Sequence, residues 1–454
     1  MHKPRKISSL MKFLALSVCT FILIACGGGS GGGNTGTATS TSPVKVNPET
    51  NNNNPVGTIP PGAPMVTDIE RAFAIAAGIV ARQQANGSWQ FDDAGTLTTL
   101  TDAYQGQAGI LFFLCKVYQN QAHPELKKSI LAGATWLTAQ NISNDGPGLF
   151  NGQAGVAYAY LSLYETFKDS SWLDVAISIA KRIENDRSQL DGAPGDMIAG
   201  HVSNGLFFLK LYELSKDQRW LTAAKTKADE SLTKAIRAGG GIKFETALSS
   251  TNKVSYVGFA HGAAGAGYFY ASLAQVLGQN GSAYQKAAQE VATWLRSIAT
   301  TDGTGINWYR REPDQLTTLQ NQWCHGAPGI GLFFSKLYEI SKNPQDLAMA
   351  KDAAATALRV GHSGTSLCHG IASLAQLYLR LFRLTGDAIY LQQARAVGEK
   401  LWTTWDRNLH YPSWMGDDGS TRIHNASLMT GNAGRGYLYL QLNDPQHLAT
   451  PFLE

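Results

Sequence analysis

The chain of 454 residues is 44% hydrophobic and only 16% charged, so it has enough apolar side chains for a large buried core. Its formal net charge is +4, and four positive charges with no negative ones lie in residues 1–25, so the remainder is close to neutral. This balance gives no basis for nucleic-acid binding, and we expect no nucleic-acid partner.

Residues 1–25 have the form of a bacterial lipoprotein signal peptide. A basic stretch precedes an apolar run from Phe13 to Ala25, which is short for a membrane span and typical of a signal peptide. The run ends in LIACG at 23–27, which resembles a lipobox with cleavage before Cys26 and lipid on its sulfur. An ordinary signal peptide or a short anchor is the alternative. We expect an exported protein, held on a membrane of the bacterial cell envelope through Cys26, facing the periplasm or in the outer membrane.

Residues 26–65 consist mainly of Gly, Ser, Thr, Asn and Pro. Such a segment cannot bury enough apolar surface to fold, so we predict a disordered linker. No other stretch has the composition of a linker, and residues 66–454 are predicted to form one domain.

In residues 66–454 a turn containing glycine, followed by an apolar run rich in Leu, Phe and Tyr, occurs seven times. Charged, amphipathic stretches such as 286–299 separate these runs. A helix that is apolar all round must be buried, whereas an amphipathic helix covers it from outside. The turns start at Gly106, Gly152, Gly200, Gly262, Gly326, Cys368 and Gly431.

This repetition predicts an all-α fold, an α,α-toroid of about seven inner and seven outer helices that follows the disordered linker. An open solenoid of helix pairs is the alternative architecture. Glycines at the start of the inner helices would leave backbone N–H groups facing a shared central cavity. Strand signals are sparse, and the glycines at 239–241 are expected to lie in a loop.

Two of the five cysteines are candidates for chemistry. Cys19 lies in the signal segment, Cys26 is assigned to lipid, and Cys115 lies in an apolar run where an inert buried thiol is expected. Cys324 and Cys368 remain. Two thiols in an oxidising compartment are expected to form a disulfide or to bind a metal ion.

The residues around the two cysteines favour a metal ion. His369 follows Cys368 directly, and both cysteines lie at the starts of predicted inner helices. Two thiolates and one imidazole can hold zinc tetrahedrally with the fourth position open, which is the composition of a catalytic site. Helix N-termini also lower thiol pKa values. From the residues alone, a disulfide between Cys324 and Cys368 beside a bystander His369 remains the alternative.

Four motifs resemble those of the lanthionine synthetase C-like (LanC-like) family, in order and spacing, across residues 66–454. The resemblance implies an α,α-toroid with zinc on Cys324, Cys368 and His369 and a peptide or small thiol substrate in the central cavity. In the family's peptide cyclases, zinc binds a cysteine thiol of the substrate, and the thiolate adds to dehydroalanine or dehydrobutyrine. We therefore expect an enzyme that forms carbon–sulfur bonds. The motifs are AHGAAG at 260–265, WCHGAPG at 323–329, LCHG at 367–370 and SLMTGNAG at 427–434.

The resemblance also implies roles for residues near the zinc site. His261 matches the family's acid–base histidine, which would protonate the enolate formed by thiolate addition; capping of its own helix is the alternative. Asp196 matches the family's active-site aspartate and could orient His261 or accept a proton, although a plain helix cap would also use Asp here. His325 resembles the motif of eukaryotic members and could reach the cavity or lie behind the ligands. His201 lies in a comparable turn and is expected to be structural.

Three features depart from the family pattern. Lantibiotic cyclases have an arginine just upstream of the first zinc cysteine, suited to steadying the enolate. This chain has LQNQW at 319–323, and Arg310 and Arg311 are not aligned with that position. Ser373 stands where a glycine is expected. Cyclases of the family act in the cytosol, so for this chain we expect another thiol or electrophile outside the cytoplasm, such as a peptide modified before export.

Two other functions remain open. A zinc-stabilised toroid could bind a peptide or thiol without turnover. A carbohydrate-active toroid would need paired carboxylates and aromatic platforms for sugars. Candidates for these are Asp302, Glu312, Asp314, Trp308 and Tyr309, although the acidic residues resemble loop charge more than a catalytic pair.

Overall fold

The computed structural model describes residues 67–93, 96–312, 319–359, 364–404, 411–412, 422–423 and 425–453. All of them belong to one compact unit, Asn54–Glu454. The expected signal peptide, the lipid attachment at Cys26 and the linker lie outside the described residues and stay predictions. In the described part of the chain, no helix is both long and apolar enough to cross a membrane.

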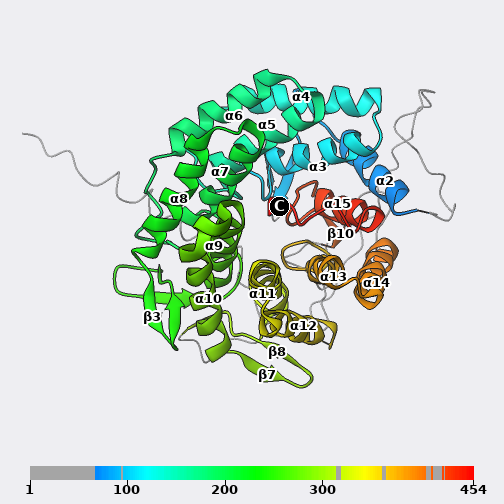
Figure 1. Cartoon of the computed structure of the whole chain (residues 1–454). Helices are drawn as coiled ribbons and strands as arrows, with labels where there is room; N and C mark the ends of the chain where they lie inside the picture. The colour runs from blue at the N-terminus through cyan, green and yellow to red at the C-terminus, as the bar shows by residue number, and fades with distance from the viewer. Residues whose placement is uncertain are drawn as a thin grey trace, which may run out of the picture. The chain divides into compact units, whose positions relative to one another are not determined.

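The unit consists of an inner and an outer layer of helices (Figure 1). The inner helices are buried around almost their whole circumference, as uniformly apolar runs require. In α9, for example, every residue from 263 to 274 is buried. The inner helices of the described chain are α3 (Gln107–Asn120), α5 (Gln153–Phe167), α7 (His201–Ser215), α9 (Ala263–Leu277), α11 (Ala327–Ser341), α13 (Ala372–Thr385) and α15 (Asn432–Asn443).

The outer helices are amphipathic and bury one face each. In α6 the buried residues Ala176, Ile179, Ala180 and Ile183 recur at helical spacing, whereas the opposite face is exposed. The described outer helices are α2 (Asp68–Val80), α4 (Pro124–Thr138), α6 (Ser170–Ile183), α8 (Gln218–Leu232), α10 (Ser282–Ser297), α12 (Pro344–Arg359) and α14 (Ala388–Thr404), with a short 3₁₀ turn, η1 (Gly278–Gly281), before α10.

The helices form a closed ring, because the last inner helix packs against elements from the start of the chain. α15 lies against α13, α3 and α2 (Figure 1). No outer helix follows α15 in the described residues, and α2 takes that place from the other end of the domain. Ile75 of α2 lies beside Gly436 of α15. This closure confirms the predicted α,α-toroid and rules out an open solenoid of helix pairs.

Tight turns join inner helices to the outer helices that follow them. At four of these junctions a residue in the left-handed conformation ends the inner helix, and an Asp or Asn side chain caps the outer one. Lys168 has a φ of 58°, and the Asp169 carboxylate accepts the backbone N–H of Ser171 at 3.0 Å. The same arrangement occurs at Lys216-Asp217, Lys342-Asn343 and Gly386-Asp387.

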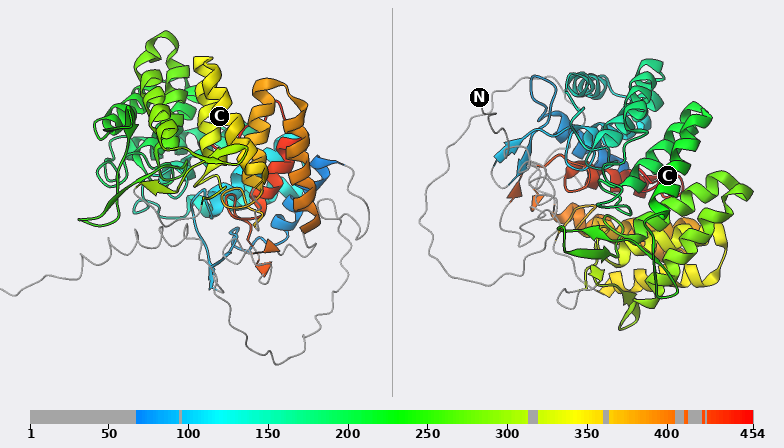
Figure 2. Two further views of the ribbon diagram at one scale, coloured as in Figure 1. Left: turned by 90° about the horizontal axis from the view of Figure 1, so that it is seen from below. Right: turned by 90° about the vertical axis from the view of Figure 1, so that its left-hand side faces the viewer.

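The connections from outer to inner helices are longer and carry short antiparallel strands, which lie toward one end of the ring (Figure 2). The prediction of a loop at 239–241 is wrong for Gly241, which lies in a strand of a β-hairpin. Gly239 and Gly240, with φ of 55° and 78°, form the turn of a β-hairpin. The strand pairs are β1 (Phe91–Asp93) with β2 (Thr96–Thr98), β3 (Ile236–Ala238) with β4 (Gly241–Lys243), β5 (Thr246–Ala247) with β6 (Lys253–Tyr256), β6 with β9 (Arg311–Glu312), β7 (Thr300–Asp302) with β8 (Gly305–Asn307), and β10 (Tyr411–Pro412) with β11 (Arg422–Ile423).

The C-terminal end of the described chain lies at the centre of the ring (Figure 1), where Phe452 packs against aromatic side chains of the inner helices. The ring centroid of Phe452 lies 4.6 Å from that of Phe112 and 4.7 Å from that of Tyr158. The hydroxyl of Tyr268 donates to the carbonyl oxygen of Leu453 at 3.1 Å. The end of the chain is therefore part of the core and contacts side chains of α3, α5 and α9.

Candidate metal centre

The turns before the inner helices are joined into a closed circle of backbone hydrogen bonds. Each turn donates or accepts through a residue close to its glycine, so turns that are distant in the sequence become neighbours in space. The N–H to carbonyl oxygen distances are 2.7–3.2 Å for Met197 to Ala260, Ala260 to Cys324, Trp323 to Cys368, Cys368 to Met429, Met429 to Tyr104, Tyr104 to Phe150, and Phe150 to Ile198.

Three consecutive turns of this circle carry a histidine at the same position. The turns read AHG, CHG and CHG, so His261, His325 and His369 each follow a residue of the hydrogen-bonded circle. In the second and third turns that residue is Cys324 or Cys368. When the three turns are aligned at their glycines, the sequence alone shows that the three histidines occupy equivalent positions.

Cys324, Cys368 and His369 form a group, among the described residues, that could hold a metal ion. One ligand atom from each lies within 4.8 Å of the others, and all three side chains are buried. Cys368 Sγ lies 3.9 Å from His369 Nε2. Zinc bonds of about 2.3 Å to sulfur and about 2.0 Å to nitrogen separate tetrahedral donor atoms by roughly 3.5–4 Å. The donor set and its spacing therefore fit zinc with one position open.

No disulfide joins Cys324 to Cys368, both of which lie in the described region. Sγ of Cys324 lies 3.5 Å from Gln322 Oε1 and 3.8 Å from the carbonyl oxygen of Cys368. Cys115 is buried in α3, and burial raises its pKa to about 12. It therefore stays a neutral thiol, as expected for an inert core cysteine.

Asp196 holds the ring of His261 in one orientation. Oδ2 of Asp196 lies 2.6 Å from His261 Nδ1. Oδ1 accepts the backbone N–H groups of Ile198 at 2.7 Å and Ala199 at 2.9 Å. An ionised carboxylate only accepts, so Nδ1 donates and proton exchange is left to Nε2. One oxygen of Asp196 therefore holds the turn before α7 and the other orients the histidine, whereas the N-cap residue of α7 is Gly200.

His325 is fully buried beside His261 and Tyr256. Its ring centroid lies 5.4 Å from that of His261 and 5.8 Å from that of Tyr256. Neither ring nitrogen has a hydrogen-bond partner within the described part of the chain. Burial, His261 and the Arg310 guanidinium lower the pKa of His325 well below its usual value, so the ring is neutral.

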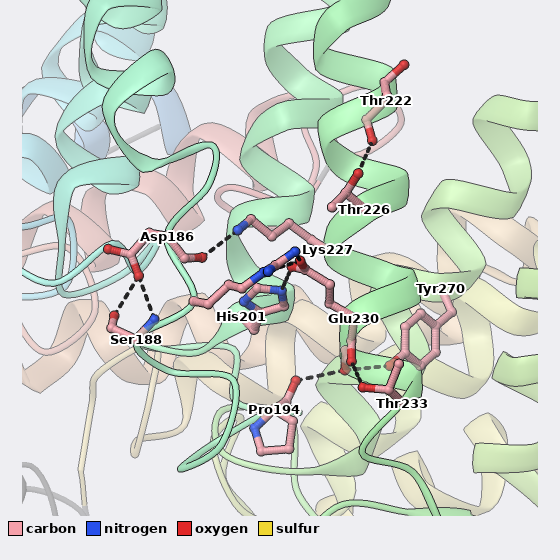
Figure 3. A network of polar contacts seen from close by, with 12 residues as sticks. Asp186, Ser188, Pro194, His201, Thr222, Thr226, Lys227, Glu230, Thr233 and Tyr270 are labelled. Atoms are coloured by element: carbon pink, nitrogen blue, oxygen red, sulfur yellow. Dashed lines mark hydrogen bonds and ion pairs between the residues drawn. The ribbon is translucent and has the colours of Figure 1, made fainter.

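His201 faces the outer helix α8 (Figure 3). Its Nε2 lies 2.7 Å from Glu230 Oε2, and Lys227 donates to the carbonyl oxygen of Asp186 at 2.6 Å. Burial, together with the Lys227 ammonium, lowers the pKa of His201 to about 4. The neutral ring therefore donates from Nε2 to Glu230 and joins α7 to α8, in line with the structural role expected for it.

Two residues that the motifs did not place near the site are brought there by strand pairing. β6 pairs with β9 and sets Tyr256 opposite Arg311. The guanidinium carbon of Arg310 then lies 5.7 Å from the centroid of the Tyr256 ring.

Ser373, which stands where a glycine was expected, is buried and donates its hydroxyl to the carbonyl oxygen of Gly370 at 2.7 Å.

The model of the lanthionine synthetase C-like protein family matches residues 99–454. The chain belongs to this family. LanC-like protein GCL1 of Arabidopsis thaliana is 30% identical over 128 residues, which cover 27% of this chain and 28% of the plant protein. Over this match, the chain spans less than a third of that relative's length. The structure of nisin cyclase superposes with a TM-score of 0.62 at 18% identity, covering 84% of this chain and 93% of that one, which is a likeness of fold.

In this LanC-like protein, Trp308 and Glu312, two of the five residues considered for a carbohydrate site, have other partners. Trp308 is fully buried and donates its indole N–H to the carbonyl oxygen of Leu295 at 2.8 Å, so it is a core residue and not a sugar platform. Glu312 pairs with Lys243 at 3.0 Å. The remaining acidic candidates, Asp314 and the side chain of Asp302, lie outside the described residues.

Proposed function

We propose that this LanC-like protein is a zinc-dependent enzyme that activates a substrate thiol for addition to a dehydroamino acid or a similar electrophile, which forms a thioether. The observation that carries the proposal is the combination of two groups on one circle of turns. Cys324, Cys368 and His369 could hold a metal ion, and the Asp196–His261 pair lies on the neighbouring turns. A thiolate-rich metal site and an oriented histidine are what thiol addition requires.

In the proposed reaction, Cys324, Cys368 and His369 hold the ion. When bound, zinc would supply a Lewis acid that lowers the pKa of the incoming thiol. The ionised sulfur bonds to the β-carbon of the electrophile, and the electron pair of the carbon–carbon double bond moves onto the acyl group as an enolate. The α-carbon then takes a proton, which balances the proton lost by the thiol. His261 is suited to give it from Nε2, because Asp196 accepts from Nδ1 and keeps the ring in one tautomer.

The first test is the zinc content of the purified full chain. We expect about one zinc ion per chain if three protein ligands bind it as in catalytic sites. The Cys324→Ala, Cys368→Ala double variant should lose the metal, whereas Cys115→Ala should keep it because that thiol lies in the core of α3. A chain without zinc, with Cys324 and Cys368 oxidised to a disulfide, would refute the proposal.

A binding module without turnover is separated from an enzyme by His261→Asn. The zinc-loaded chain is incubated with a cysteine peptide and a dehydroalanine peptide, and thioether formation is followed by mass spectrometry. An enzyme should lose about 10²–10⁴-fold in rate in the variant while its zinc content is unchanged. Thiol binding without any thioether product in the unaltered protein would instead identify a binding module.

We further propose that the protein is exported and anchored to the cell envelope through lipid on Cys26, and that it acts there on a peptide or small thiol in the central cavity. The support is the basic and apolar pattern of residues 1–25 and the LIACG sequence that ends it. Incorporation of a labelled fatty acid, lost in Cys26→Ala, is the expected result. A chain that stays unlabelled in the cytosol would contradict it.

A further inference from the structure

Beside the metal-ligand group, several buried polar atoms have no hydrogen-bond partner in the described residues. They are the hydroxyl oxygen of Tyr256, Nε of Arg310 and both ring nitrogens of His325. The side chains of Tyr256 and His325 are 2% and 0% exposed. Buried polar atoms are costly to leave unpaired, so a group of them in one place points to a ligand that pairs with them.

The backbone holds these side chains together. Val257, which follows β6, donates its N–H to the carbonyl oxygen of Arg310 at 3.1 Å. Tyr256 precedes it, and the centroid of its ring lies 5.9 Å from that of His261 and 5.8 Å from that of His325. Arg310 is therefore fixed on the same side of the site as the proposed proton donor.

Arg310 brings a positive charge that no acidic side chain of the described residues neutralises. Its guanidinium lies over the Tyr256 ring at 5.7 Å, and no ion pair joins it to an acidic side chain within the described stretches. The nearby carboxylate of Glu312 pairs with Lys243 instead, at 3.0 Å. A guanidinium with a buried Nε–H group and no carboxylate partner among the described residues is well suited to bind an oxyanion.

We propose that Arg310 and the hydroxyl of Tyr256 form an oxyanion-binding subsite beside the metal-ligand group, which holds the acyl oxygen of the electrophile as it becomes negatively charged. This inference rests on the proposed function. Segment 319–323 of this chain contains no arginine, and the inference assigns the positive charge to Arg310 instead. Donors aimed at an oxygen that gains charge lower the barrier, because they stabilise the enolate more than the neutral acyl group.

The subsite can be tested without turnover, by using a thiol that mimics the enolate. In β-mercaptopropionate a sulfur is followed by two carbons and a carboxylate, which is the same connectivity as between the sulfur and the anionic oxygen after addition. The amide, β-mercaptopropionamide, has the same shape without the charge. Affinities of both for the zinc-loaded full chain are measured by titration calorimetry at fixed ionic strength.

We expect the unaltered protein to bind the carboxylate about tenfold more tightly than the amide, since a charge-assisted hydrogen bond replaces a neutral one. Arg310→Gln should reduce this preference to about twofold or less, and Arg310→Lys should keep part of it because Lys retains the charge without the planar donors. The matched control is Arg311→Gln, the neighbouring arginine on β9, which should keep the full preference. Tyr256→Phe should lower it by a smaller factor than Arg310→Gln.

Three results with the variants would overturn the inference: the preference survives in Arg310→Gln, Arg311→Gln loses it to the same extent, or Arg310→Gln loses its zinc, which would make Arg310 a structural residue. If the zinc-loaded protein binds neither thiol, the proposed function itself fails and the subsite fails with it. Binding of both thiols without a preference for the carboxylate would refute the subsite alone.

Discussion

His261, His325 and His369 occupy the same position in three consecutive turns, yet their neighbours differ. Nε2 of His369 lies 3.9 Å from a cysteine sulfur, and Nδ1 of His261 lies 2.6 Å from a carboxylate oxygen. His325 is surrounded by the rings of His261 and Tyr256. At the scale of single residues, the environment of each imidazole and not its place in the repeat decides whether it can bind a metal ion, carry a proton or stay neutral.

The pairing of Asp196 with His261 leads to a prediction for Asp196→Asn. The amide oxygen can still accept the N–H groups of Ile198 and Ala199, so the fold and the zinc content should be unchanged. The amide nitrogen would face His261 Nδ1 and favour the wrong tautomer. We expect the rate of thioether formation to fall about 10²–10⁴-fold, measured together with zinc content and the melting temperature.

The matched control for this change is Asp102→Asn. The Asp102 carboxylate accepts the backbone N–H groups of Gln105 at 2.7 Å and Gly106 at 3.1 Å, so it caps the turn before α3 in a similar way. It is not bonded to a histidine in the described residues. Full activity in Asp196→Asn, or an equal loss in Asp102→Asn, would mean that the aspartate is only a cap.

At the scale of elements, ion pairs join neighbouring inner helices near the ends opposite to the circle of turns. Glu165 of α5 lies 3.7 Å from Lys116 of α3 and 3.1 Å from Lys210 of α7. Glu339 of α11 lies 2.7 Å from Arg380 of α13. Helices α3, α5, α7, α11 and α13 are therefore linked to a neighbour at one end by backbone hydrogen bonds of the turns and at the other by ion pairs.

The ion pairs of Glu339 make the stability of the fold depend on pH in a measurable way. Burial acts to raise its pKa, but the Lys336 ammonium and the Arg380 guanidinium outweigh burial and hold the pKa at about 2. A carboxyl group whose pKa is lower in the folded state stabilises the fold above its unfolded pKa of about 4.5, and that stabilisation is lost as the pH falls toward 2.

We therefore expect Glu339→Gln to lower the free energy of unfolding by about 2 kcal/mol at neutral pH. The difference from the unaltered protein should shrink as the pH falls from about 4.5 toward about 2. Urea unfolding at several pH values measures it. Glu213→Gln is the control, because Glu213 is 58% exposed in its pair with Lys210 and should change stability by less than about 1 kcal/mol. A difference that does not vary with pH would contradict the ion-pair assignment.

At the scale of the whole molecule, the ring is completed by a helix outside the family match. The match covers residues 99–454, whereas α2 spans Asp68–Val80 and covers the outer face of α15. Without α2 the last inner helix would expose apolar surface that the other inner helices bury. The structural domain therefore begins before the segment that identifies the family.

This closure predicts that Ile75→Ala destabilises the whole ring. Ile75 is fully buried against α15, and removal of a buried isoleucine side chain of this kind costs about 2–5 kcal/mol. Ile389→Ala on the outer helix α14 makes the same change at a residue that is 45% exposed, and it should cost less than about 1 kcal/mol. Denaturant unfolding of the full chain compares them. Equal effects would show that α2 does not close the ring.

The sequence alone determined the two layers of helices and the identities of the metal-ligand candidates. Both are local: an apolar run must be buried wherever it lies, and the thiols and imidazole of Cys324, Cys368 and His369 are visible as residues at the starts of repeats. Sequence reasoning missed the strands around 239–241, where it predicted a loop. The positive φ values of Gly239 and Gly240 close a β-hairpin there.

Only the tertiary structure decided which of these residues meet. The hydrogen bond of Asp196 to His261, the closure by α2 and the placement of Arg310 over Tyr256 depend on contacts between segments far apart in the chain. No short stretch contains the information for such contacts, because each forms only when the circle of turns and the pairing of β6 with β9 have brought its two segments together. The ring therefore brings residues of four of the seven similar turns together, and it gives each of them different surroundings.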